Sequence, residues 1–521
     1  MSRTRKAFLS LTFGYAQYGL ALVSGLFVLP FILAHVDSRS YGLWLASLEV
    51  LAYVGYVDLG VISVLPWMVA ACDGANDRQG IRSLLVNGLI LALLGSVLYL
   101  LTALVLWHWL PALTGMPASD QQLLLGPLAI AITANVILFP ARVLYGILAG
   151  LQDVAFIGWM TLVQSVINLA ILLLMIWSSY GLYALTCAAS VPTMVFCLGV
   201  GLRLRWLAPD LFVSWPRPTL ARMIQLAGQG LTTWMAAIGW RMSAASNSLL
   251  IVATGGGPEA AVIYSCTAKL GEMLMPLAWQ CSDSALVGLA QLHGEGHRER
   301  VREIILLMLR LLLLAVGGAA VALLAFNPTF VTLWVGSDKF GGRTLNALLV
   351  AAIVSLSLSH GVFAAASVTG NRFRVGLLTL LQGGLYGVLA LSLGWLSGAK
   401  GIATAASLSA LLLAVPLGAL ALRNCTGVTP RDVAREVLGT WLPRAALPLA
   451  VAASLGLWIP PERLWISVAA APALGLLYLL YMRPLYVDLP LPGGLDKWLL
   501  RLRLVPGHLG RRGMRGISSC R

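Results

Sequence analysis

The chain has 521 residues, of which 59% are hydrophobic and only 11% are charged, and its net charge is +15. Soluble domains carry about 25% charged residues, so this composition, with a mean hydropathy of +0.86, excludes a soluble globular protein. Apolar runs of roughly 20 residues, the length needed to cross a bilayer, recur along the whole chain. The sequence therefore predicts an all-α polytopic membrane protein.

The first apolar run follows a short basic stretch, MSRTRKAFLS. A signal peptide has a shorter apolar core and a small-residue cleavage site, so this run is predicted to be an uncleaved span. The last two predicted spans are short and flanked by prolines, and twelve spans with a re-entrant or interfacial pair is the alternative. The fourteen predicted spans lie near 11–34, 43–71, 82–108, 123–150, 156–178, 182–202, 223–254, 262–290, 303–326, 344–369, 375–396, 402–422, 443–459 and 464–482.

The distribution of Lys and Arg predicts the orientation of these spans. With the N-terminus inside, 26 of the 35 basic residues fall in inner segments, five in outer segments and four within spans. Cytoplasmic loops are enriched in Lys and Arg, so both termini are predicted to be cytoplasmic. The basic excess then faces anionic lipid headgroups and not nucleic acid.

The parts outside the membrane offer no enzyme chemistry. No outer loop is long enough for a catalytic domain, and the sequence contains no P-loop, no nucleophile elbow and no HExxH motif. The seven cysteines are scattered without a CxxC pair, which indicates neither a disulfide framework nor a metal site. We therefore expect no enzymatic activity, no cofactor and no metal.

The C-terminal tail, residues 483–521, is basic. Its segment 495–505 places apolar residues on one helical face and basic residues elsewhere, a pattern typical of a helix lying on the membrane surface. A disordered tail is the alternative, because the end of the chain is rich in Gly and Arg.

An internal repeat runs through the chain at an offset of 220 residues. It aligns ACDGANDRQGIR (71–82) with QLHGEGHRERVR (291–302) without gaps, and the same offset pairs glycines of two other loops. Two parallel halves with a site at their interface are a common transporter plan, although Gly and Arg also favour loops by chance. The predicted domains are six-helix bundles at 1–205 and 206–425, two extra transmembrane helices at 426–482, and the tail.

Three stretches of the chain carry a family resemblance: MSRTRKAF at the start, VLPFILAHVDSRSYGLWLASLEVLAYVGYVDLGV (28–61) and AAVIYSCTAKLGEMLMPL (260–277). With them the whole chain resembles the polysaccharide-flippase (Wzx-type, O-antigen flippase) branch of the MOP superfamily, the multidrug/oligosaccharidyl-lipid/polysaccharide exporters that include MATE exporters and lipid II flippases. The resemblance implies two six-helix bundles around a central cavity, plus two C-terminal helices.

The same resemblance implies a function. Members of this branch are bacterial inner-membrane proteins that translocate undecaprenyl-diphosphate-linked oligosaccharide to the periplasmic face. The expected partners are the lipid-linked oligosaccharide, membrane lipids, and a polysaccharide polymerase or chain-length machinery.

Ionisable residues within spans are the candidates for a site, because each costs about 2.5–3.5 kcal/mol or more at mid-bilayer and needs a partner or water. In the eighth span, spacings of three and four place polar residues on one helical stripe, which we expect to line a cavity. The stripe consists of Ser265, Lys269, Glu272, Pro276, Gln280 and Asp283.

Arg241 lies near the middle of the seventh span, with Trp234 and Ser248 on the same face and alanines around it. A guanidinium can bind a phosphate through paired donors. The structural alternative is an Arg241–Glu272 pair that only holds two helices together.

Glu49 and Asp58 in the second span lie on opposite faces of a regular helix, unless Gly55 or Gly60 disturbs it. Glu49 is the better cavity candidate, because it aligns with Glu272 at an offset of 223 residues, which implies a three-residue indel in the second span of each half. Arg142 is a further cavity candidate, although it could also reach the inner surface by snorkelling.

These residues predict a site for an anionic substrate. Arg241, Lys269 and Arg142 would bind the diphosphate, with Glu49, Glu272 and Gln280 in the same cavity, and ion coupling would use Glu49, Glu272, Asp283 or Asp58. The main alternative is a MATE-like cation-coupled multidrug antiporter that uses the acidic residues as its site. A membrane polymerase or ligase would need a large periplasmic loop, and a scaffold without transport would tolerate loss of every intramembrane charge.

Overall fold

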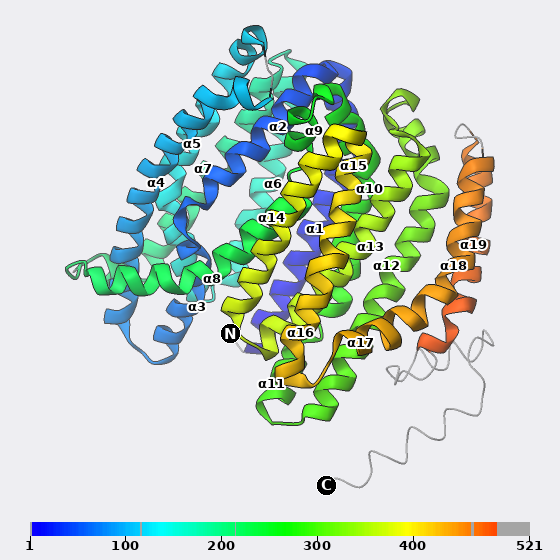
Figure 1. Ribbon diagram of the computed structural model, residues 1–521. Coiled ribbons are helices and arrows are strands. Elements are labelled where there is room, and N and C mark those ends of the chain that lie inside the picture. The colour runs from blue at the N-terminus through cyan, green and yellow to red at the C-terminus, as the bar shows by residue number, and fades with distance from the viewer. Residues whose placement is uncertain (1–2, 115–116, 214, 460–462, 487–521) are drawn as a thin grey trace. The chain divides into compact units, whose positions relative to one another are not determined.

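The computed structural model describes residues 3–114, 117–213, 215–459 and 463–486, and Figure 1 follows the chain through them. The described residues form helices joined by short loops, with no β-strand among them. This confirms the predicted all-α membrane class. The candidate interfacial helix at 495–505 lies outside the described residues.

Within the described ranges, eleven helices are long and apolar enough to cross a membrane, or twelve if one bent pair counts as a single span. Two of the fourteen predicted spans are not among them. The structure forms 223–254 as α8 (Leu220–Ala244) and α9 (Asn247–Ala253), and 262–290 as α10 (Gly257–Asp283) and α11 (Leu286–Gly294). Both regions are interrupted and carry polar residues that lower their hydropathy, so the count of fourteen is compatible with the structure and stays a prediction.

The chain divides by packing into two compact units. Unit 1 comprises residues 1–265 and 376–402, and unit 2 comprises 266–375 and 403–521. This division is based on contacts in the structure, whereas the predicted domains are based on the sequence repeat. The two do not test each other, so the predicted domain boundaries near 205 and 425 stay predictions.

Unit 1 contains the long helices of the first part of the chain and most of α14. Its centre is an apolar core in which α3, α4, α5 and α7 pack together, with Leu65, Phe139 and Val143 fully buried. Its helices are α1 (Arg3–His35), α2 (Ser38–Val54), α3 (Val61–Gly74), α4 (Arg78–Thr114), α5 (Ala118–Gly150), α6 (Val154–Trp177), α7 (Leu182–Leu207), α8, α9, the first residues of α10, and α14 (Arg372–Ser397).

Unit 2 is built around α12, which packs against α13, α18 and α19. Gly317 of α12 leaves room for Trp441 and Tyr478, and the Tyr478 hydroxyl donates to the Leu314 carbonyl at 2.7 Å. Its helices are most of α10, α11, α12 (Arg298–Val335), α13 (Gly342–Thr369), most of α15 (Ala399–Ser409), α16 (Val415–Thr426), α17 (Pro430–Asp432), α18 (Gly439–Trp458) and α19 (Leu464–Tyr486).

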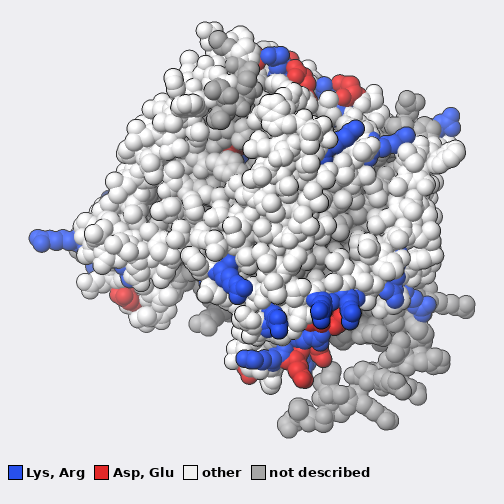
Figure 2. Space-filling view, in the orientation of Figure 1, with Lys and Arg blue, Asp and Glu red and all other residues white. Residues whose placement is uncertain are grey.

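The surface is suited to lipid. In Figure 2, large continuous areas of the visible face carry no Lys, Arg, Asp or Glu. Large apolar side chains such as Trp177, Leu198 and Trp395 are more than half exposed. Exposed apolar area on this scale marks an interaction with membrane or protein, and together with the long apolar helices it indicates membrane.

The second predicted span is broken. α2 ends in a 3₁₀ turn at Gly55–Asp58, and α3 leaves it at an angle of 42°. Leu59 and Gly60 have positive φ values of 51° and 73°, and the Asp58 carboxylate accepts from the amides of Gly60 at 3.1 Å and Ile62 at 3.3 Å. Asp58 therefore caps the start of α3, since a carboxylate there satisfies free amide groups.

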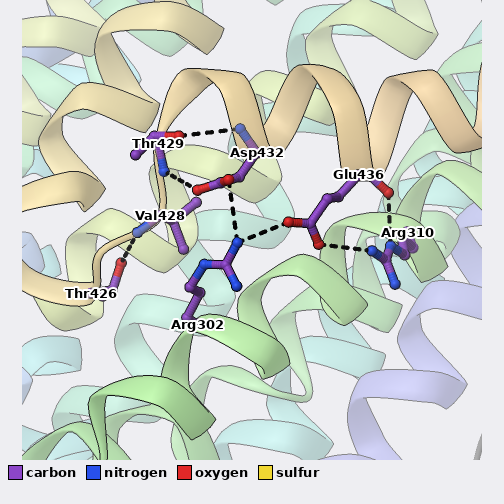
Figure 3. Close-up of polar contacts among 7 residues, drawn as sticks. All are labelled: Arg302, Arg310, Thr426, Val428, Thr429, Asp432 and Glu436. Atoms are coloured by element: carbon purple, nitrogen blue, oxygen red, sulfur yellow. Dashed lines mark hydrogen bonds and ion pairs between the residues drawn. The ribbon is translucent and has the colours of Figure 1, made fainter.

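A cluster of charged residues fixes the segment that precedes the last two helices (Figure 3). Glu436, in a π-helical turn at Val433–Leu438, accepts from Arg302 at 2.8 Å and from Arg310 at 3.2 Å, both on α12. Asp432 pairs with Arg302 at 3.2 Å and closes a capping box with Thr429. Arg310 is thus used within unit 2 to hold the segment that leads into α18.

Replacing Glu436 by alanine should lower the unfolding free energy by about 1–2 kcal/mol, because two partly exposed arginines lose a shared acceptor. The measurement is the thermal unfolding midpoint of the purified protein in detergent. Arg435→Ala is the matched control, since the neighbouring Arg435 is exposed and its loss should leave the midpoint unchanged. Equal midpoints for the two variants would contradict a stabilising role for Glu436.

Candidate functional site

A cavity of about 440 Å³ lies within unit 1, walled by α2, α4, α5, α7 and α8. A volume of this size falls in the range of small-molecule sites, which is about 300–1,000 Å³. Two of the predicted site residues, Arg142 and Arg241, line it, and they are the charged residues among those that do. The structure thus brings together two arginines that lie far apart in the sequence.

Arg142 is held in place by its own helix, α5. Its Nη2 atom donates to the Asn135 side-chain oxygen at 2.8 Å, and its guanidinium carbon lies 5.2 Å from the centre of the Phe139 ring. Asn135 stands two turns before Arg142, so both side chains share one face of the helix. The remaining guanidinium donors are available to a ligand in the cavity.

Arg241 lies in the last turn of α8. After one intervening residue, a run of small side chains leads into the break between α8 and α9. Arg241 forms no ion pair within unit 1, and its buried Nε atom has no hydrogen-bond partner among the described residues. Leaving a buried donor of a charged group unpaired is costly. An anion in the cavity would remove that cost.

The rest of the cavity wall combines aromatic, uncharged polar and aliphatic side chains, the last including Leu48, Leu51 and Leu138. α2 contributes Trp44, the 3₁₀ turn after it contributes Tyr56, and α7 contributes Ser190 and Thr193. Thr193 is supported from behind by Gln164 of α6, whose side-chain amide donates to its hydroxyl at 3.0 Å. Among the lining residues none is acidic, so the cavity combines two fixed positive charges with hydroxyl and amide groups, which suits an anionic, polyhydroxylated ligand.

Glu49 lies beside this cavity without lining it. Its two carboxylate oxygens accept from the backbone amides of Ser248 at 3.1 Å and Leu249 at 2.7 Å, at the start of α9. It also lies close enough to Arg241 to interact with it electrostatically. Asp58, capping α3, interacts in the same way with Arg142.

The predicted polar stripe of the eighth span falls on one continuous helix, α10. Glu272 and Gln280 are exposed, whereas Thr267, Gly271 and Ala278 on the other side are buried. Lys269 and Glu272 interact electrostatically, but neither forms a hydrogen bond or an ion pair with a described residue of unit 2. Glu272 and Gln280 therefore point away from the packed interior of their unit.

Asp283, at the end of α10, has a partner that sequence reasoning missed. Its Oδ1 atom lies 2.9 Å from Nε2 of His360 on α13. The Trp279 ring stacks on the His360 ring at 4.0 Å and donates to the Ser357 hydroxyl at 2.9 Å. The pair therefore joins the end of α10 to α13 inside unit 2.

Two signals in the sequence point to other residues that were missed. Thr186, Ser190 and Thr193 follow each other at spacings of four and three, which indicates a polar stripe on α7. Asn135, seven residues before Arg142, shares its face. His360, and Tyr53, whose hydroxyl is hydrogen-bonded to that of Ser246, offered no comparable signal, because their partners lie far away in the sequence.

The fold is similar to those of two kinds of solved membrane transporter. The lipid II flippase MurJ, in an inward closed conformation, aligns with a TM-score of 0.66 over 92% of this chain and 99% of its own, at 13% identity. An inward-facing multidrug resistance MATE family transporter of the MOP superfamily aligns with a TM-score of 0.61 over 81% of this chain and 98% of its own, at 14% identity.

At these identities the likeness shows the fold alone, and it confirms the expected MATE- and lipid-flippase-like fold class. No protein-family model and no curated protein matches the sequence.

Proposed function

We propose that the chain is a flippase that moves undecaprenyl-diphosphate-linked oligosaccharide, the repeat unit of an O-antigen, capsule or exopolysaccharide, from the cytoplasmic to the periplasmic leaflet by alternating access. The observation that carries this proposal is the unit 1 cavity, in which Arg142 and Arg241 share a wall that carries hydroxyl and amide groups and no carboxylate. The fold shared with a lipid II flippase supports it. The protein would lie in the bacterial inner membrane with both termini in the cytoplasm.

In this proposal the diphosphate binds to the guanidinium groups of Arg142 and Arg241. Paired donors of arginine match phosphate oxygens in geometry and in charge. Lys269, Glu272 and Gln280, on the exposed stripe of α10, are proposed to contact the same substrate, and its lipid tail would remain in the bilayer.

The direction of movement needs no nucleotide. Moving two negative charges outward across an inside-negative membrane releases about 4–5 kcal/mol at 100 mV. Coupling to an ion would use the acidic residues Glu49, Asp58, Glu272 or Asp283. Of these, Asp283 has a side-chain partner in His360.

Complementation tests the proposal. In a strain that lacks its own flippase, the wild-type chain should restore surface polysaccharide, and Arg241→Ala and Lys269→Ala should each reduce it severely at equal expression. Arg205→Ala, an exposed arginine of α7, controls for net charge and should complement fully.

Normal polysaccharide with both the Arg241 and the Lys269 variant would overturn the cationic site. Drug resistance on overexpression, without complementation by the wild-type chain, would instead indicate the multidrug antiporter. That alternative has the MATE fold similarity in its favour, but a basic cavity repels cationic drugs.

A further inference from the structure

The α8–α9 break consists of Ala245 and Ser246 and begins four residues after Arg241, and residues of α2 contact it. The Arg241 carbonyl accepts from the Ala245 amide at 2.9 Å and from the Ser246 hydroxyl at 3.1 Å. Neither proline nor glycine occurs there, so the local sequence does not require the helix to stop. Contacts from other helices must stabilise the interruption.

Those contacts come from one face of α2. Glu49 and Tyr53 of α2 are four residues apart and therefore share a helical stripe, and Tyr56 lies in the 3₁₀ turn that follows α2. The Glu49 carboxylate binds the first amides of α9, the Tyr53 and Ser246 hydroxyls are hydrogen-bonded, and the Tyr56 carbonyl accepts from the Trp234 ring nitrogen at 2.6 Å. The packing of α2 on α9 is visible in Figure 1.

A further contact reaches the break from α14. The Tyr386 hydroxyl donates to the Asn247 side-chain oxygen at 2.7 Å, and Tyr386 is fully buried. The charged or titratable groups around Glu49 in unit 1 are thus Arg241 on α8, Tyr53 on its own helix and Tyr386 on α14.

We propose that Glu49 is a positioning residue for Arg241: by holding the start of α9, it fixes the break at which the Arg241 guanidinium is presented to the cavity. The inference rests on the proposed function, because it assigns Glu49 a role in binding the diphosphate through Arg241. Glu49 does not touch the substrate in this arrangement. Its carboxylate is already used by the amides of α9.

The positioning role and the charge of Glu49 predict opposite changes in diphosphate affinity when Glu49 is replaced. Glu49 is an anion near a cationic site, so electrostatics alone would make its removal tighten the binding of a diphosphate. Positioning predicts the opposite for Glu49→Ala. Glu49→Gln removes the same charge but retains an oxygen that accepts from an α9 amide, so it should bind better than the alanine variant.

The experiment measures the binding of farnesyl diphosphate to the purified full-length chain by calorimetry. Glu49→Ala should weaken binding about tenfold, which corresponds to the loss of a helix cap, and Glu49→Gln should weaken it about threefold or less. Tighter binding by both variants would overturn the inference, because it would show that Glu49 acts only through its charge.

A double-mutant cycle shows whether Glu49 acts through Arg241. Adding Glu49→Ala to Arg241→Ala should cause no further loss, whereas adding it to Arg142→Ala should again cause about a tenfold loss. Equal losses in both backgrounds would indicate general destabilisation and overturn the inference.

If Glu49→Ala does not fold, Tyr53→Phe takes its place, since it removes only the hydroxyl that holds Ser246. It should weaken binding in the Arg142→Ala background and leave the Arg241→Ala background unchanged. Failure of the proposed function itself looks different: Arg142→Ala and Arg241→Ala would then bind the probe as the wild type does.

Discussion

Replacing both Arg142 and Arg241 by alanine should abolish measurable binding of farnesyl diphosphate to the purified chain. Each single replacement should weaken binding about tenfold to a hundredfold, because a charged hydrogen-bonded contact in a partly desolvated site contributes about 1.5–3 kcal/mol. The pair forms the full positive charge of the cavity lining. The loss in the double variant should therefore exceed that of either single variant.

Two controls separate this effect from a change in folding or in net charge. Arg205→Ala removes one positive charge from an exposed part of unit 1 and should bind the diphosphate as the wild type does. Farnesol, which has the same hydrocarbon chain without phosphate, should bind all variants equally. Undiminished binding of farnesyl diphosphate to the double variant would show that this cavity is not the anion site.

The sequence marked Arg142 and Arg241 as candidates together with Lys269, because a charge within a membrane span needs a partner or water. It could also anticipate a disturbance of the second span, since Gly55 and Gly60 lie in it. The structure shows the break there, with Asp58 capping the next helix.

What the sequence could not provide are contacts between residues that are far apart along the chain. Asp283 finds His360 across 77 residues, and Glu49 reaches the start of α9 across about 200. The residues at the break in the seventh span do not predict it, because contacts from α2 stabilise the break. Hydropathy alone also cannot show that α14 belongs to the unit that contains α8. These two helices approach closely because Gly239 of α8 lies against the backbone of Thr379 of α14.

The break before α3 and helix α8 meet backbone to backbone at Gly60 and Gly230, which leaves no room for a side chain. This contact leads to a prediction about stability. A Cβ atom on Gly60 would lie 2.5 Å from the Gly230 carbonyl oxygen, and Gly60 has a φ of +73°. Gly60→Ala should therefore lower the unfolding free energy by more than about 3 kcal/mol, since a left-handed conformation costs an L-residue about 1–2 kcal/mol and the backbones must also separate. The measurement is the thermal midpoint together with the yield of monodisperse protein.

Gly55→Ala is the matched control for Gly60→Ala, because it is the same substitution five residues earlier in the same break. Gly55 has a φ of −60°, and a Cβ atom there would meet nothing within 4 Å. Alanine at 55 should leave stability unchanged or raise it by about 0.4–1 kcal/mol, since it restricts the unfolded chain. If the two variants unfold at the same temperature, α3 and α8 do not approach as the structure shows. The hydrogen bond between the Tyr56 carbonyl and the Trp234 ring nitrogen would then lose its support as well, because Tyr56 lies in the same break as Gly60 and Trp234 lies on α8 with Gly230.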